Sequence, residues 1–515
     1  MRKLVSLLLA LMLVLGMFAA ASAAEYPIVS EPISVTGVFA ATGRDVETPR
    51  LTWTTIEEVT GIHVDWIKVE TGSLPVFMAA GEWPDFFHDR LDSTYINDYG
   101  ILGNMFVDYS DYLDIMPNLV QTFEDYPDSR KAITEVNGAM YQLPSIEVSA
   151  TCTQARVYYR EDVLEANGLA VPTTTEEFYE TLKALKEAND GAAPLVVNPY
   201  SSAYFEPWMF SAFGPGCVTD FEDDGTGKVV YNRISDQYKL YLEYMHRLYA
   251  EGLLHEEYLT LDGTTQLSLA QEGLTVFMEG TAHSLVEADF PSGHVDLNVM
   301  TPLTSEYDDE RVVMGQLTGS CGGFAINAQS EYVEEICKML DIFYATEEVV
   351  PGTGLYGIAG CYGPEGGMWR FTDDTHDFYE FILPEDFEGT TTDYQYGHVI
   401  LNNCGRVDAL SHAVTSTPGN AQSRQLGFVN NLIPYHQDIN LVWPGSRLKF
   451  TDDEQFVLDN NFLEINTKAD EMRSQFITGV ADIDNEWDSY VALIESMGLE
   501  DVLAVYQASY DRWLG

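Results

Sequence analysis

Aromatic side chains in loops rich in glycine, proline or polar residues are the groups of this chain best suited to bind a ligand. Trp83 stands two residues before Asp85, next to Gly81 and Pro84. A sugar is complementary to an aromatic ring beside a polar side chain, because its C–H faces pack on the ring and its hydroxyls bond the polar group. The other candidates of this kind are Tyr204, Trp208, Tyr362, Trp369 and Trp443. We predict that these seven residues line a binding cleft, the alternative being that each packs against a helix.

Motifs for catalysis are incomplete in this sequence. His255 and Glu256 begin like a zinc-protease helix, but Leu259 occupies the place of the second histidine. Ser320 is not in a nucleophile elbow, because Thr318 stands where the first glycine should be. Glycoside hydrolysis needs only two carboxyl groups at a defined separation, which a sequence does not give. No catalytic residue is predicted, and a secreted carbohydrate-active enzyme remains the alternative function.

One acidic loop has part of the pattern of a calcium site. Residues 220–225 start like an EF-hand loop, yet Lys228 falls at the ninth position and Tyr231 at the twelfth, where a carboxylate should coordinate. We interpret the segment as a hairpin turn into residues 229–231. No cofactor or metal is therefore predicted, and a structural calcium ion is left open as the alternative.

The first 24 residues predict an export signal. Arg2 and Lys3 precede an apolar run from Leu4 to Ala20, and small residues follow at 21–24. No cysteine lies near the cleavage point, so a lipid anchor on a new N-terminal cysteine is not expected. No later apolar stretch reaches the roughly 18 to 20 residues that span a bilayer. We predict a secreted protein, periplasmic or associated with the cell surface.

The chain is strongly acidic. Its 81 Asp and Glu against 26 Lys and Arg give a net charge of -55, which becomes -57 when Arg2 and Lys3 leave with the signal. Nucleic acids would be repelled, so they are excluded as partners. Six cysteines are scattered without a CxxC motif, which indicates neither a zinc knuckle nor a redox site. Hydrophobic residues at 46% predict well-packed cores, and the length of 515 residues predicts two or three lobes.

Strand and helix signals alternate along the chain. Residues 33–39 and 62–67 have the partly period-two pattern of strands, with a helical stretch around 53–59 between them. Three later helices combine an N-terminal Ser or Thr with an apolar stripe, and they are predicted to begin at Thr174, Ser235 and Ser330. Glu177 would complete a capping box with Thr174. The alternation predicts α/β lobes in which helices cover sheets.

Seven segments carry a family pattern in a fixed order. The longest runs from Tyr158 to Leu169 and continues into Pro172-Thr173-Thr174, as an aromatic strand, an Arg-x-Asp turn and a helix end. The other six lie at 80–85, 137–144, 248–253, 356–360 and 476–479 and in the C-terminal run 487–506. Together they resemble the family 1 extracellular solute-binding proteins of ABC transporters, particularly the larger, lipoprotein-like, carbohydrate-binding branch. Gln142 and Ala359 depart from the family pattern, which usually has glycine and glutamate there.

The resemblance implies a two-lobed clamshell of the periplasmic-binding-protein type, type II-like, with a helix-rich C-terminal lobe. The N-terminal lobe would comprise residues 25–150 and 309–345, and the C-terminal lobe residues 151–308 and 346–515. The chain would cross between the lobes near 145–158, 295–308 and 345–352.

The resemblance also implies a function. A protein of this kind captures an oligosaccharide or similar polyol between its lobes and delivers it to the permease subunits of an ABC importer. A monomer is expected. A sensor subunit that presents its ligand to a signalling receptor is a second alternative, and a peptide or polyamine ligand is left open.

Overall fold

The computed structural model describes residues 25–41, 51–88, 90–146, 157–197, 204–261, 265, 268–269, 275–279, 297–315, 317–376, 378–385, 387, 405–407, 414–415, 432–435 and 442–515. These residues form two compact units. Unit 1 comprises the described residues of Met1–Ser149 and Thr318–Ser416, and unit 2 those of Ala150–Leu317 and Thr417–Gly515. The predicted export signal, residues 1–24, lies outside the described residues.

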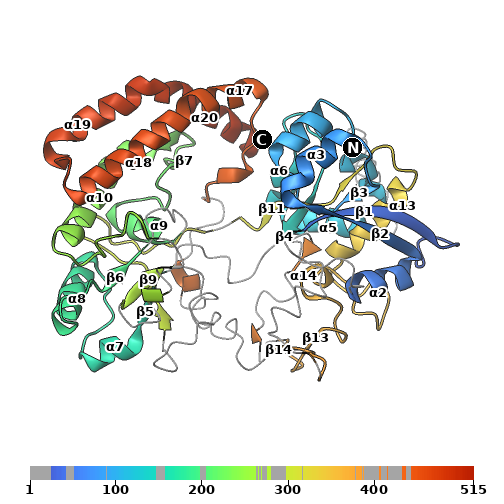
Figure 1. The fold of residues 1–515 in the computed structure, drawn as a ribbon, viewed down its shortest axis with the longest axis horizontal. Helices are drawn as coiled ribbons and strands as arrows, with labels where there is room; N and C mark the ends of the chain where they lie inside the picture. Colours follow the sequence, from blue (N-terminus) through green and yellow to red (C-terminus); the bar gives the residue numbers. More distant parts are fainter. Residues whose placement is uncertain are drawn as a thin grey trace, which may run out of the picture. The chain divides into compact units, whose positions relative to one another are not determined.

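The main sheet of unit 1 has the strand order β12-β3-β1-β2, of which β1, β2 and β3 are labelled in Figure 1. β1 runs parallel to β2 and β3, whereas β12 comes from a later part of the chain and pairs antiparallel with β3. The strand predicted at 62–67 is confirmed, and its first four residues are alternately buried and exposed. The strands are β1 (Ile33–Ala41), β2 (Ile62–Glu70), β3 (Phe86–Phe87) and β12 (Ala325–Ile326).

Two smaller sheets complete the strands of unit 1. One has the order β11-β4-β15, and the other has the order β13-β14-β16. The strands are β4 (Leu143–Ile146), β11 (Gly319–Gly323), β15 (Gly405–Arg406), β13 (Trp369–Phe371), β14 (Phe378–Phe381) and β16 (Val414–Thr415). β15 pairs parallel with β4, which brings residues more than 250 positions apart into one sheet.

Helices cover these sheets. The helix predicted between the first two strands is α2, which buries Trp53 and Ile56 in the core of unit 1. The helix predicted from Ser330 begins only at Val333, because the Ser330 hydroxyl donates to Asp85 and accepts from the backbone of Tyr332. The helical segments of unit 1 are α2 (Leu51–Thr60), η1 (Thr71–Ser73), α3 (Leu74–Ala80), α4 (Ser93–Tyr95), η2 (Ile96–Ile101), η3 (Tyr109–Ile115), α5 (Pro117–Asp125), α6 (Pro127–Ile133), α13 (Val333–Asp341), η7 (Ile342–Tyr344) and α14 (Ala359–Tyr362).

Unit 2 contains a four-stranded sheet of order β10-β5-β9-β6 and a separate hairpin, β7-β8. β6 and β9 are parallel, and β5 is antiparallel to both β9 and β10. The carboxyl ends of β6, β9 and β10 therefore lie at the same edge of the sheet. The strands are β5 (Val157–Arg160), β6 (Leu195–Val196), β7 (Phe221–Asp223), β8 (Val229–Tyr231), β9 (Phe277–Glu279) and β10 (Leu297–Val299).

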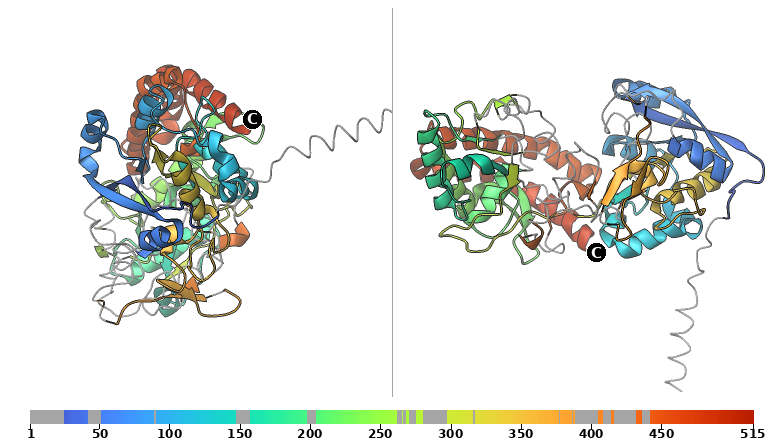
Figure 2. Two further views of the ribbon diagram at one scale, coloured as in Figure 1. Left: turned by 90° about the vertical axis from the view of Figure 1, so that its right-hand side faces the viewer. Right: turned by 90° about the horizontal axis from the view of Figure 1, so that it is seen from below.

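The C-terminal helices, drawn in red in Figure 2, belong to unit 2, and two of them, α18 and α19, pack against α10. The helix predicted from Ser235 is α10, and the Ser235 hydroxyl caps it at the amide of Tyr238. The helical segments are α7 (Glu161–Ala166), α8 (Thr175–Ala188), α9 (Phe205–Phe210), η5 (Ser211–Phe213), η6 (Asn232–Ile234), α10 (Asp236–Ala250), η9 (Ile433–Tyr435), η11 (Gly445–Arg447), α17 (Asp452–Val457), η12 (Leu458–Phe462), α18 (Leu463–Thr478), α19 (Ile483–Ile494), η13 (Glu495–Leu499) and α20 (Glu500–Leu514). Among the described residues, no helix has the length and apolarity that a bilayer crossing requires.

The predicted N-cap of α8 is confirmed, but its capping box is not. The Thr174 hydroxyl accepts from the amide of Glu177 at 3.1 Å. The carboxylate of Glu177, however, accepts from the amide and hydroxyl of Thr173, both at 2.8 Å. The second half of the box therefore closes one residue earlier than the sequence pattern predicts.

The boundaries between the two units differ from the predicted ones in two places. Residues 318–345 belong to unit 1, but the described part of 309–317, which the prediction placed with them, belongs to unit 2. The prediction placed residues 346–515 together in the C-terminal lobe, whereas the described part of 346–416 belongs to unit 1. The physical reasons are the pairing of β15 with β4 and the ion pair of Arg406 with Asp125 at 2.6 Å. Local sequence signals contain neither contact.

A buried carboxylate in unit 1 gives a pH prediction. Asp341 accepts hydrogen bonds from the amides of Asn118 and Leu119, but burial raises the pKa of its carboxyl from 3.8 to about 7. Between those pH values the folded protein binds more protons at this site than the unfolded chain does. The free energy of unfolding contributed by Asp341 should therefore fall as pH rises, by at most about 1.4 kcal/mol per pH unit.

Asp341→Asn should remove this part of the pH dependence. The measurement is urea unfolding of the wild type and the variant at several values between pH 4 and 7, comparing slopes rather than absolute stabilities. Asp114→Asn, at an exposed position in η3, is the matched control and should leave the slope unchanged. Equal slopes for all three proteins would contradict the prediction.

Candidate functional site

The predicted ligand-binding residues divide between the two units. Trp83, Asp85, Tyr362 and Trp369 belong to unit 1, and the other three belong to unit 2. In unit 1, Tyr362 and Trp369 share one hydrophobic cluster around β13 and β14. In open α/β sheets, ligands bind outside the carboxyl ends of strands. By this rule, each unit has a candidate ligand-binding surface of its own, outside the carboxyl ends of its strands.

Trp83 and Asp85 lie in the loop that leads into β3. The Trp83 indole donates to the carbonyl of Met78 at 3.0 Å, and its half-buried ring stacks on Phe106 with 5.2 Å between centroids. One oxygen of Asp85 accepts from the amide and hydroxyl of Thr36, at 2.7 and 2.8 Å. The other accepts from the Ser330 hydroxyl at 2.6 Å. Both oxygens of Asp85 thus join segments of unit 1, which favours a structural role over ligand contact.

Trp208 and Trp369 do not line an accessible surface. Both side chains are 0% exposed. Trp208 packs against Phe178 and Phe205, with centroids 5.9 Å away in each case. The Trp369 indole donates to the carbonyl of Gly363 at 2.9 Å. For these two residues the predicted cleft position is corrected to a core position.

Tyr362 and Trp443 keep part of their rings exposed. Tyr362 stacks on Phe381 with 5.9 Å between centroids. Trp443 is tilted against Tyr510 with 5.0 Å between centroids. Their predicted contact with a ligand stays a prediction.

Tyr204 lies at the N-terminus of α9, beyond the carboxyl end of β6. The next residue, Phe205, donates its amide to the carboxylate of Glu279 at 2.8 Å, and Glu279 is the last residue of the parallel strand β9. Tyr204 is half-buried, and its hydroxyl makes no hydrogen bond with any described residue. Its position, and a hydroxyl without a partner in the described part of the chain, make Tyr204 the best-placed candidate ligand contact of unit 2.

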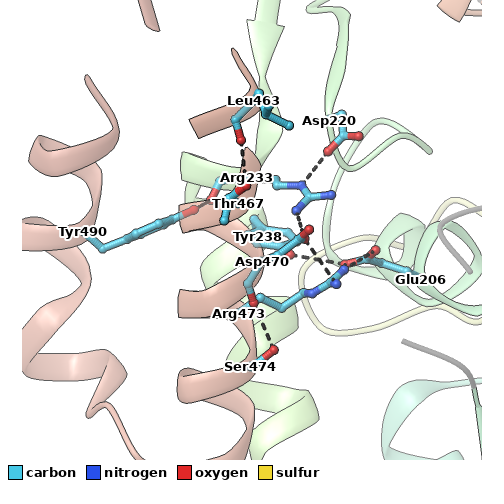
Figure 3. A network of polar contacts seen from close by, with 10 residues as sticks. All are labelled: Glu206, Asp220, Arg233, Tyr238, Leu463, Thr467, Asp470, Arg473, Ser474 and Tyr490. Atoms are coloured by element: carbon cyan, nitrogen blue, oxygen red, sulfur yellow. Dashed lines mark hydrogen bonds and ion pairs between the residues drawn. The ribbon is translucent and has the colours of Figure 1, made fainter. Parts of the chain in front are cut away.

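A buried ion pair holds the start of α9 (Figure 3). Arg473 of α18 lies 3.1 Å from one carboxylate oxygen of Glu206 and 3.3 Å from the other. The Tyr238 hydroxyl donates to the same carboxylate at 3.2 Å. Glu206 is 5% exposed and Arg473 is 7% exposed. Because both charges are removed from water, each depends on the other for compensation.

Arg233 extends this network (Figure 3). Its guanidinium contacts Asp220 and Asp470, each at 2.5 Å, and Asp470 also lies 3.3 Å from Arg473. The Tyr490 hydroxyl donates to the carbonyl of Arg233 at 3.1 Å. Two guanidinium groups and three carboxylates thus connect η6, α9, α18 and the segment before β7. No spacing in the sequence indicates this network, because its members come from positions 206 to 473.

The sequence prediction missed one candidate residue in unit 1. Arg90 follows the carboxyl end of β3, is exposed and has no carboxylate partner among the described residues. Gln142 fixes the adjacent backbone, because its side-chain amide bonds the carbonyl and amide of Leu91 at 3.0 and 2.7 Å. The available signal was a basic residue just after a short apolar strand in a very acidic chain.

The acidic loop after residue 220 is a hairpin turn, as predicted from its sequence. Asp223 accepts from the amides of Gly225 and Gly227, and Asp224 accepts from Thr226. The Tyr510 hydroxyl donates to the second oxygen of Asp223 at 2.8 Å. Within the described ranges, no group of three or more metal-binding side chains converges.

The comparison with known proteins bears on the family. No family model matches the chain. It is 24% identical over 493 residues to the fructooligosaccharide ABC transporter substrate-binding protein FusA of Streptococcus pneumoniae, covering 89% of this chain and 86% of FusA. The chain is a homologue of ABC transporter substrate-binding proteins. The resemblance to solute-binding proteins inferred from the sequence is thereby confirmed.

Other homologues agree with this assignment. The polygalacturonan/rhamnogalacturonan-binding protein YtcQ of Bacillus subtilis is 25% identical over 332 residues, which cover 62% of this chain and 64% of YtcQ. An HMO-binding, ABC-transporter-associated solute-binding protein from Bifidobacterium longum infantis superposes with a TM-score of 0.71 at 20% identity, over 94% of this chain and 99% of that one. A FusA structure with kestose gives 0.69 at 20% identity, again covering 94% and 99%. These solute-binding proteins share the fold, which confirms the predicted α/β class and two-lobed type.

Proposed function

We propose that this chain captures an oligosaccharide or similar polyol and delivers it to the permease subunits of an ABC importer. The observation that carries the proposal is the homology with FusA, a fructooligosaccharide-binding protein, over 89% of the chain. The chain itself supplies suitable groups: a partly exposed Tyr204, whose hydroxyl bonds no described residue, a partly exposed Trp83, and the exposed Arg90. Rings would pack on sugar faces, and the polar groups would bind hydroxyls.

The proposal includes a binding role without catalysis, a secreted location and a monomeric state. A structural calcium ion is not part of it. One similar structure is of a FusA EF-hand mutant. In this chain, Asp223 and Asp224, in the loop whose sequence starts like an EF-hand, accept hydrogen bonds from the turn's own amides.

A thermal-shift screen of residues 25–515 tests the proposal. The panel contains kestose, nystose, galacturonan oligomers, monosaccharides, amino acids, peptides and polyamines, and each hit is incubated and analysed for cleavage. A ligand at 100 times its Kd should add about 2.7 kcal/mol to the free energy of unfolding. Stabilisation by an intact oligosaccharide supports the proposal. Release of shorter sugars would contradict the binding role, and no shift with any saccharide would contradict the ligand class.

Tyr204→Ala should weaken oligosaccharide affinity by about 10- to 100-fold, because an aromatic platform and a hydroxyl are both lost. The measurement is isothermal titration calorimetry with the best ligand of the panel. Tyr249→Ala is the matched control. Tyr249 is a half-buried tyrosine of α10, and the nearby Leu253 bonds Leu195 at the amino end of β6, whereas Tyr204 lies beyond the carboxyl end of that strand. Its Kd should equal that of the wild type. Equal losses in the two variants would place the ligand elsewhere.

A further inference from the structure

The ion pair between Glu206 and Arg473 lies close to the candidate ligand contact Tyr204. Glu206 is two residues after Tyr204, in the first turn of the six-residue helix α9. Arg473 belongs to α18, which is 267 residues later in the chain. Because α9 is short, helix hydrogen bonds alone hold it weakly. Contacts to other elements therefore decide where α9 begins.

Two anchors fix this beginning. The carboxylate of Glu279 accepts from the amide of Phe205, and Arg473 holds the carboxylate of Glu206. Glu279 belongs to the sheet, so it sets the distance of α9 from the strand ends. Arg473 holds the opposite, helical side, and its own position is set by Asp470, which also contacts Arg233. Loss of Arg473 would leave a buried carboxylate beside Tyr204 without a counter-charge.

We propose that Arg473 is a positioning residue for the ligand-binding surface: through Glu206 it fixes the N-terminus of α9 and hence the ring of Tyr204. This inference rests on the proposed function. Helix α18 would then contribute to ligand affinity without its side chains touching the ligand. The alternative is that the ion pair only stabilises unit 2.

A double-mutant cycle separates these two roles. Kestose is the probe, and Kd is measured by calorimetry for the wild type, Arg473→Met, Tyr204→Ala and the double variant. Arg473→Met should weaken affinity by about tenfold or more, because the binding surface loses its preorganisation. In the Tyr204→Ala background, the same substitution should change Kd by less than about twofold. Independent, multiplying effects would overturn the proposal.

Arg512→Met is the matched control for removing an arginine from the same unit. Arg512 of α20 pairs with Glu454 at 2.8 and 2.6 Å, and its side chain is 39% exposed. Kestose affinity should be unchanged in this variant. Arg473→Lys keeps a charge that reaches Glu206 and should recover part of the affinity. Packing alone would not make Arg473→Lys bind kestose more tightly than Arg473→Met.

Two further measurements cover loss of folding and loss of binding. If Arg473→Met does not fold, Glu206→Leu combined with Arg473→Met removes both charges, which often restores stability. This variant should fold and still bind kestose about tenfold more weakly, whereas wild-type affinity would overturn the proposal.

Hydrogen exchange without sugar should be faster at residues 205–210 in the Arg473 variants than in Arg512→Met. If the wild type binds no saccharide, the proposed function fails, and the exchange data still decide whether Arg473 holds α9.

Discussion

Arg233→Met should lower the free energy of unfolding of unit 2 by about 3 to 5 kcal/mol. Arg233 is 4% exposed, and its guanidinium is the direct partner of both Asp220 and Asp470. Methionine fills similar volume but carries no charge, so Asp220 would lose this ion pair and Asp470 would keep only its longer contact with Arg473, at 3.3 Å. Water reaches those carboxylates, whose side chains are 37% exposed, and this lowers the cost toward 3 kcal/mol.

Arg247→Met is the control for a surface ion pair. The Arg247 side chain is 39% exposed, and its partner Glu176 is 62% exposed. Exposed pairs contribute about 0 to 1 kcal/mol, so this variant should be nearly as stable as the wild type. Both are compared by urea unfolding monitored by circular dichroism. Equal destabilisation in the two variants would show that the Arg233 network is no stronger than a surface pair.

Local signals in the sequence were sufficient for the elements that frame the candidate site. Thr174 and Ser235 cap helices where the pattern predicted them, because an N-cap needs only a hydroxyl and a neighbouring amide. The α/β alternation and the first two strands follow from short-range periodicity in the same way. The family resemblance added the two-lobed type, which periodicity does not give.

Contacts between distant segments explain what the sequence did not predict. The prediction placed residues 346–416 in the C-terminal lobe, whereas their described part lies in unit 1, where β15 pairs with β4 across more than 250 positions. Asp85 was predicted to contact ligand, yet its carboxylate bonds Thr36 and Ser330, which flank it by 49 and 245 residues. In both cases the deciding partner lies outside any local window.

The candidates Tyr204 and Trp208 show the same limit within a single helical turn. Both are aromatic residues of one loop-to-helix segment, and composition does not distinguish them. The phase of α9 does: Trp208 points into the core and is 0% exposed, whereas Tyr204 remains partly exposed. That phase is set by Glu279 and Arg473, which are 74 and 267 residues from their partners.

Trp208→Ala should lower the free energy of unfolding by about 3 to 5 kcal/mol, since it leaves a cavity beside Phe178 and Phe205. Trp208→Phe should cost much less. It keeps most of the ring volume and removes a buried indole N–H that has no hydrogen-bond partner in the described part of the chain. Thermal unfolding of both variants measures this difference.

Kestose affinity decides between the core position and a ligand contact for Trp208. A core residue whose replacement preserves packing should leave Kd unchanged, so Trp208→Phe should bind like the wild type, while Tyr204→Ala should not. Trp513→Ala, at a half-buried position in α20, controls for the loss of an indole from the same unit and should destabilise less than Trp208→Ala. A stable Trp208→Phe with strongly weakened binding would contradict this prediction.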